Sequence, residues 1–93
     1  YKRQHLVSDE DLAIGAGAVA STIFHPVGTV KMGPDSDPMA VLDGRLRLRG
    51  IAGLRVIDAS VMPTITSGNT AAPTMMIAEK GAAMMLEDAR PSV

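Results

Sequence analysis

The first regular pattern of apolar and polar residues begins at Ser8 and is that of an amphipathic helix. Serine is a residue that caps helices, and the three acidic residues after Ser8 would lie in a first turn where the helix dipole favours negative charge. These features predict a helix from Ser8 to about Ser21. Gly15 and Gly17 each cost this helix about 1 kcal/mol relative to alanine, so it needs packing to hold it. Its expected apolar face consists of Leu12, Ala16, Val19 and Ala20.

Further along, the chain twice shows a pattern typical of β-strands. Residues 45–49 alternate arginine and leucine, which predicts a half-exposed strand with its leucines facing inward. Residues 50–53 contain two glycines and predict a turn, and residues 54–58 predict a second, largely buried strand that ends on Asp58. A carboxylate at the end of a buried strand either meets a ligand or caps the next turn, and the local sequence leaves both roles open.

The last regular pattern is a helix from Thr74 to about Ala89 that is apolar on most of its sides. Pro73 lies near its first turn, where the missing N–H is harmless. Only a narrow polar strip interrupts the apolar surface, so the helix must be buried. The chain has too few residues to surround it, which implies that further protein surface covers it. Its free N-terminal N–H groups suit an anionic ligand or developing negative charge.

Between the first helix and the strands lies a histidine in an unusual setting. His25 follows an apolar run, residues 19–24, and precedes Pro26 and Gly28, which force the backbone out of regular structure. An imidazole held at such a bend can be aimed into a cavity and act as an acid or a base. The alternative is a structural histidine whose ring bonds to a nearby carbonyl, and for a single histidine this is the commoner role.

Composition and charge exclude several classes of function. Apolar residues make up 46% of the chain, but aromatic residues only 2%, and there is no cysteine, which is unusual for a small free-standing domain. We therefore expect a piece of a larger protein. Nine basic and ten acidic residues, without a basic stripe, argue against a nucleic-acid partner. The two histidines and the scattered carboxylates form no metal-ligand cluster, so we expect no metal.

The sequence shows neither a membrane span nor a signal peptide. No stretch approaches about 18 uninterrupted apolar residues, and no charged-then-apolar leader opens the chain. We expect a cytoplasmic protein, with a leader upstream of Tyr1 left open.

Several separated motifs occur along the chain in an order that is itself informative. They are His25-Pro26-Val27-Gly28-Thr29, Lys31-Met32-Gly33, Leu54 to Ser60 with Met62-Pro63, Ser67 to Thr70, Ala72-Pro73-Thr74 and Met76 to Lys80. Together they resemble the C-terminal region of the glucose–methanol–choline (GMC) oxidoreductases, over roughly residues 8–89. The resemblance implies an α/β fold and an FAD-dependent, choline-dehydrogenase-like enzyme that oxidises an alcohol by hydride transfer to flavin.

The resemblance also implies roles for single residues. His25 matches the active-site histidine, which is the expected base for the alcohol proton. Asn69 matches the second catalytic position, His or Asn in the family, and can donate a hydrogen bond to the developing alkoxide. At Ala71 the family often has asparagine, so this chain lacks a polar side chain there. The positions implied to contact the cofactor are Asp58, Ala59, Asn69, Thr70 and Ala71.

The glycine-rich motif that would hold the FAD pyrophosphate, G-x-G-x-x-G after a strand, does not occur in this sequence. We therefore expect residues 1–93 to be the C-terminal segment of a larger flavoenzyme, without its N-terminal dinucleotide-binding part. Residues 8–53 are then mostly substrate domain, as a helix, a strand and a loop. Residues 54–90 return to the FAD domain as a strand and a buried helix. The expected partners are the remainder of the flavoenzyme and a small alcohol, with homo-oligomerisation as a further option.

A rival hypothesis belongs to a different class of function. The chain would then be a non-catalytic remnant or an interaction module that binds another chain through exposed apolar surface. Under either hypothesis we expect the isolated segment to be inactive as an enzyme.

Overall fold

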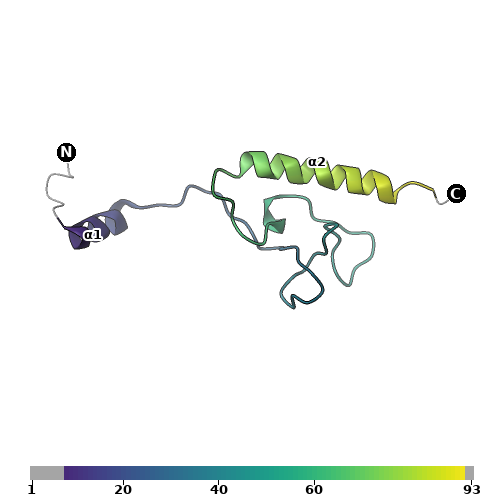
Figure 1. Cartoon of the computed structure of the whole chain (residues 1–93), viewed down its shortest axis with the longest axis horizontal. Helices are drawn as coiled ribbons and strands as arrows, with labels where there is room; N and C mark the ends of the chain where they lie inside the picture. Colours follow the sequence, from purple (N-terminus) through teal and green to yellow (C-terminus); the bar gives the residue numbers. More distant parts are fainter. Residues whose placement is uncertain (1–7, 92–93) are drawn as a thin grey trace.

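Two α-helices, one short 3-10 helix and the loops between them make up residues 8–91, the part of the chain that the computed structural model describes. In chain order the elements are α1 (Asp9–Val19), the 3-10 helix η2 (Ala59–Val61) and α2 (Ala71–Asp88). Figure 1 shows α1 at one end of an elongated molecule, joined by an extended stretch to the part in which α2 lies along the intervening loops. The predicted functional residues all lie in that second part, beyond α1.

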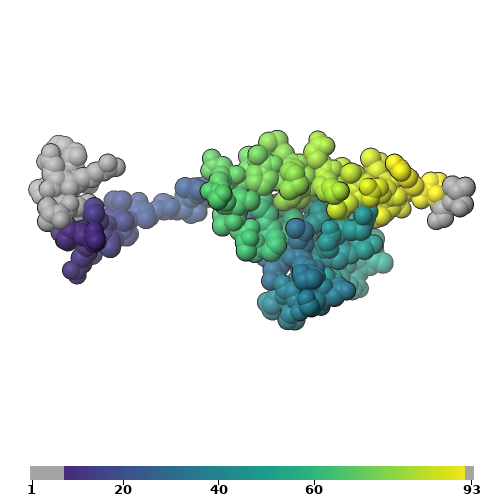
Figure 2. Space-filling model, in the orientation of Figure 1, coloured from purple at the N-terminus to yellow at the C-terminus, as the bar shows by residue number. Residues whose placement is uncertain are grey.

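Helix α1 begins as the sequence predicts and ends two residues earlier than expected. The Ser8 hydroxyl accepts a hydrogen bond from the Asp11 N–H at 3.1 Å, and three acidic residues occupy the first turn. No residue of α1 is buried, and Leu12 and Val19, on its predicted apolar face, are 50% and 78% exposed. The helix stands clear of the main body (Figure 2). The described residues therefore do not supply the packing that this helix needs.

The two predicted strands are not formed, and this part of the expected α/β architecture is wrong for residues 8–91. The structure contains only isolated bridges, which pair Met32 with Leu42, Leu42 with Leu48 and Arg47 with Arg55. The cause lies at Asp43, whose carboxylate accepts hydrogen bonds from the N–H groups of Arg45 and Arg47 at 2.8 and 3.0 Å. Leu46 takes a left-handed conformation with φ 62°, so the chain turns where an extended strand was expected.

A small apolar core holds α2 to these loops. Ile77 of α2 is buried, and the 3-10 helix η2 packs against the same helix through Val61. Full burial of a side chain of this size contributes roughly 1.5–3 kcal/mol. The buried cluster consists of Leu42, Leu46, Val61, Met62 and Ile77.

Gly81 allows α2 to approach the loop that contains Ile57. A β-carbon at Gly81 would lie 2.6 Å from Cγ2 and 2.9 Å from Cδ1 of Ile57, closer than such atoms can pack. Gly81 is buried in the middle of the helix, where glycine is otherwise unfavourable. The residue is therefore explained by close packing rather than by helix propensity.

Ion pairs connect the C-terminal end of α2 to the same loops. The Arg45 guanidinium donates to the carboxylates of Glu87 and Asp88, both at 3.0 Å, and Arg55 also bonds to Asp88. The hydrogen bond from Arg55 holds the pKa of the Asp88 carboxyl below its ordinary value, with the charge of Arg45 acting in the same direction. These contacts fix the direction of α2 along the loops.

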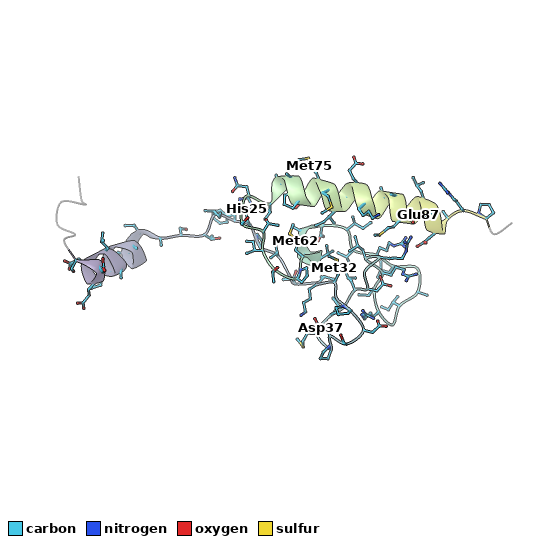
Figure 3. The ribbon with its side chains drawn as sticks, in the orientation of Figure 1. His25, Met32, Asp37, Met62, Met75 and Glu87 are labelled. Atoms are coloured by element: carbon cyan, nitrogen blue, oxygen red, sulfur yellow. The ribbon has the colours of Figure 1, made fainter. Side chains whose placement is uncertain are left out.

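The opposite face of α2 is apolar and uncovered. Met75 is 63% exposed, and it lies on the side of the helix away from Met62 and Met32 (Figure 3). Leu86, eleven residues further along, lies on the same side and is 69% exposed. Met76 and Met85 are exposed at the two flanks of the helix, where they line hollows beside the loops. The expectation that the helix is buried therefore does not hold within residues 8–91, which agrees with the expectation that these residues are too few to surround it. Neither helix of this part is long and apolar enough to cross a membrane.

The close contact at Gly81 generates a stability prediction for the full-length protein. Gly81→Ala should lower the free energy of unfolding by about 1–3 kcal/mol, because the overlap with Ile57 exceeds the gain in helix propensity. Thermal unfolding followed by circular dichroism measures the change. Ile57→Ala removes every atom of the overlap, so adding Gly81→Ala to it should cost less than in the wild type. A Gly81→Ala protein more stable than wild type would contradict the packing described here.

The uncovered face of α2 generates a second prediction. The 93-residue chain purified alone should self-associate and bind a hydrophobic dye, since four large apolar side chains of α2 are at least half exposed. Light scattering and dye fluorescence are the measurements. Met75→Lys combined with Leu86→Lys should reduce both signals. A monodisperse monomer that unfolds cooperatively and binds no dye would contradict the prediction that this apolar face must be covered by other protein surface.

Candidate active site

The backbone around His25 is shaped by short-range contacts on both sides. Before it, Phe24 has a left-handed conformation with φ 61°, and its N–H donates to the Thr22 hydroxyl at 3.0 Å. After it, Gly28 has φ 86°, and a β-carbon there would lie 3.3 Å from the Met62 carbonyl oxygen. The sequence predicted this irregular bend from Pro26 and Gly28. The structure adds that the bend passes close to the backbone at Met62.

The His25 imidazole lies against the beginning of α2. Its Nδ1 is 2.5 Å from the Thr70 hydroxyl oxygen, a hydrogen bond between residues 45 positions apart. His25 is half-buried, and Thr70 is only 7% exposed. Figure 3 shows His25 beside the N-terminal end of α2. Among residues 8–91 no hydrogen-bond partner is found for Nε2 of His25, so this nitrogen is the one left for other chemistry.

Backbone hydrogen bonds bring the His25 loop and the segment around Asp58 together. The Val30 N–H donates to the Ser60 carbonyl at 3.1 Å, and the Met32 N–H donates to the Val61 carbonyl at 2.9 Å. Ser60 and Val61 belong to η2, which packs against α2. Three segments with predicted site residues thus meet around the first half of α2.

Asp58 and Ala59 occupy the start of η2. The Asp58 carboxylate accepts a hydrogen bond from the Ser60 N–H at 2.8 Å and another from the Ser60 hydroxyl. Of the two roles that the sequence left open for Asp58, the structure contains the cap. Ala59 is half-buried and packs against the core. A cofactor contact at these two positions stays a prediction.

Asn69 and Ala71 flank Thr70 at the exposed start of α2. No side chain caps this helix, because the Thr70 hydroxyl bonds to His25, and the first turn contains no acidic residue. Its first N–H groups are therefore free to face an electron-rich group, and Ala71 adds no bulk beyond a methyl. These features fit the electronegative pyrimidine edge of a flavin, the cofactor expected from the sequence.

Thr70 is the residue whose side chain the sequence did not single out. The resemblance implied a contact of Thr70 with the cofactor, yet its hydroxyl is the group that meets His25. A buried threonine at a helix N-terminus ordinarily signals a cap, so no local pattern could have indicated this partner. Among residues 8–91 the structure brings together no group of three or more His, Cys, Asp or Glu side chains that could hold a metal ion.

A hollow lies elsewhere on the molecule. It encloses about 570 Å³ and includes none of the predicted site residues. Its walls carry Arg55 and Asp88, whose charges are already paired with each other. The lining residues are Arg47, Gly53, Leu54, Arg55, Ile57, Met85 and Asp88. The charged groups that line this hollow form the ion pairs described above, so we do not assign a reaction centre to it.

Comparison with known proteins gives a consistent result. The GMC oxidoreductase family model matches residues 2–78. The chain is 50% identical over 78 residues to mitochondrial choline dehydrogenase from Homo sapiens, which covers 84% of this chain and 13% of that protein. It is 46% identical over 81 residues to an alcohol dehydrogenase [acceptor] from Pseudomonas putida, which covers 87% of this chain and 14% of that protein.

A solved structure is also similar. The crystal structure of pyridoxine 4-oxidase from Mesorbium loti superposes with a TM-score of 0.63 at 44% sequence identity, covering 68% of this chain and 12% of that one. The chain thus spans about 13% of the length of the human relative and 12% of the solved structure.

Proposed function

The chain belongs to the GMC oxidoreductase family, and on that premise we propose that it is the C-terminal segment of an FAD-dependent enzyme that oxidises a small alcohol. The observation that carries the proposal is the His25 imidazole, held by Thr70 at 2.5 Å beside the uncapped N-terminus of α2. An acid–base group and a region of positive partial charge are thereby placed together. The relatives are named for choline, alcohol and pyridoxine, which supports an alcohol as the substrate.

In this proposal His25 accepts the proton of the substrate hydroxyl at Nε2, the nitrogen that Thr70 does not engage. Asn69, exposed one residue before Thr70, donates a hydrogen bond to the same oxygen as negative charge develops. When bound, the flavin supplies an acceptor for the hydride that leaves the alcohol carbon. The free N–H groups at the start of α2 stabilise negative charge near that acceptor.

The cofactor contacts follow from the same arrangement. The backbone of Thr70 and Ala71 approaches the flavin ring, while Asp58 and Ala59 contact the cofactor through the start of η2 with the Asp58 carboxylate retained as a cap. Residues 8–53 then belong mostly to the substrate domain and residues 54–90 to the FAD domain. Their partner is the remainder of an α/β flavoenzyme. The apolar face of α2 is exposed here, and the remainder of the enzyme would cover it. The rival hypothesis of an interaction module explains this exposure equally well.

The roles of His25 and Asn69 are tested in the full-length enzyme. His25→Ala should leave FAD bound but slow flavin reduction by on the order of 10²–10⁴-fold, the range for a positioned acid–base group. Asn69→Ala should cost less, on the order of 10–10³-fold, because it removes a single hydrogen-bond donor. Anaerobic stopped-flow reduction with saturating alcohol, followed at the flavin absorbance, measures both.

His5→Ala is the matched control, since this second histidine has no part in the proposal. Its flavin should be reduced at the wild-type rate. A His25→Ala enzyme that reduces its flavin as fast as wild type would rule out the mechanism. Loss of FAD from that variant would show that His25 has a structural role.

A further prediction concerns cofactor retention by the 93-residue chain alone. Because its sequence lacks the glycine-rich turn that binds the FAD pyrophosphate, the purified chain should not keep FAD through desalting. The absorbance ratio of flavin to protein after gel filtration is the measurement. A stoichiometric flavin spectrum would show that the segment binds the cofactor without the dinucleotide-binding part.

A further inference from the structure

We propose that Thr70 is a positioning residue for His25: its hydroxyl oxygen accepts a hydrogen bond from Nδ1–H and thereby keeps the Nε2 lone pair available for the alcohol proton. The inference rests on the proposed function and deepens it. Its starting point is the contact of 2.5 Å between Nδ1 and the Thr70 hydroxyl oxygen. Here the Thr70 side chain has a role apart from the backbone contact with the cofactor.

Thr70 is suited to this role because it is itself held firmly. Its side chain is buried, and its carbonyl accepts hydrogen bonds from both the N–H and the hydroxyl of Thr74, at 3.0 and 2.7 Å. At the N-terminus of a helix, a threonine hydroxyl ordinarily bonds to a free backbone N–H of the first turn. The Thr70 hydroxyl makes no such bond, and His25 is its hydrogen-bond partner among residues 8–91.

The direction of this hydrogen bond follows from the chemistry of the ring. If Thr70 donated to Nδ1, the neutral imidazole would carry its hydrogen on Nε2 and could not accept a proton there. If Nδ1–H donates to Thr70, Nε2 carries the lone pair. After Nε2 accepts the proton, both ring nitrogens are donors, and the bond to Thr70 persists unchanged. One hydroxyl oxygen thus serves His25 before and after proton transfer without any rearrangement of the site.

A hydroxyl also differs from a carboxylate partner in what it does to the ring. Because it carries no charge, it orients the imidazole without adding a full negative charge beside the imidazolium. Loss of this hydroxyl should therefore affect the rate of proton abstraction through the tautomer and orientation of the ring. It should leave cofactor binding intact, because the flavin contact is assigned to the backbone.

The experiment uses the full-length enzyme with Thr70→Val, which keeps the shape of the side chain and removes the hydroxyl, and Thr70→Ser, which restores a hydroxyl. We expect Thr70→Val to retain stoichiometric FAD and to slow flavin reduction at saturating alcohol by on the order of 10–10²-fold, the range found when a residue that orients a metal-bound imidazole is lost. Thr70→Ser should recover most of the rate. Thr29→Val, an exposed threonine in the His25 loop, is the matched control and should leave the rate unchanged.

The decisive measurement adds Thr70→Val to His25→Ala. If Thr70 acts through His25, the double variant should be no slower than His25→Ala alone. A structural role would instead slow both backgrounds equally, and this result would overturn the inference, as would a Thr70→Val enzyme with the wild-type rate. A wild-type rate for His25→Ala would overturn the proposed function itself, whereas a slow His25→Ala beside a fast Thr70→Val would overturn only the role of Thr70.

Discussion

The packing of α2 on the loops of residues 30–62 is the contact on which the rest of this structure depends. Ile77 enters the small apolar core, and Gly81 lets the helix approach Ile57 more closely than any side chain at that position would allow. Since Thr70 is the N-cap residue directly before α2, this packing also decides where the Thr70 hydroxyl lies. The hydrogen bond to His25 is therefore a consequence of helix docking and could not form without it.

The two ends of α2 are held by different kinds of interaction. At the C-terminal end, Asp88 is bound by Arg45 and by the largely buried side chain of Arg55, and these ion pairs restrict the direction of the helix. At the N-terminal end no ion pair occurs within residues 8–91, and the hydroxyl of Thr70 faces the imidazole. This difference leaves the free N–H groups of the first turn available to a ligand.

Residues 8–91 leave large apolar surfaces and the surroundings of His25 open. The apolar face of α2 opposite the core is exposed, and so is every large apolar residue of α1. His25 has a defined hydrogen-bond partner on one side, and the hollow of about 570 Å³ described above contains none of the predicted site residues. The chain belongs to the GMC oxidoreductase family and spans about 13% of the length of its human relative. The proposal that it is a segment of a larger enzyme assigns the missing walls to the remainder of that enzyme.

Local signals were enough for some features and not for others. The Ser8 cap, the helix around Pro73 and the turn at residues 50–53 depend on near neighbours in the chain, and all three are present. The strand predicted at residues 45–49 failed because the Asp43 carboxylate captured backbone N–H groups that a sheet would have paired. The contact between His25 and Thr70 joins residues 45 positions apart. The sequence determined the local elements and predicted which residues carry the chemistry. Only the docking of α2 decided which of those residues meet, because a contact between segments far apart in the chain leaves no local pattern.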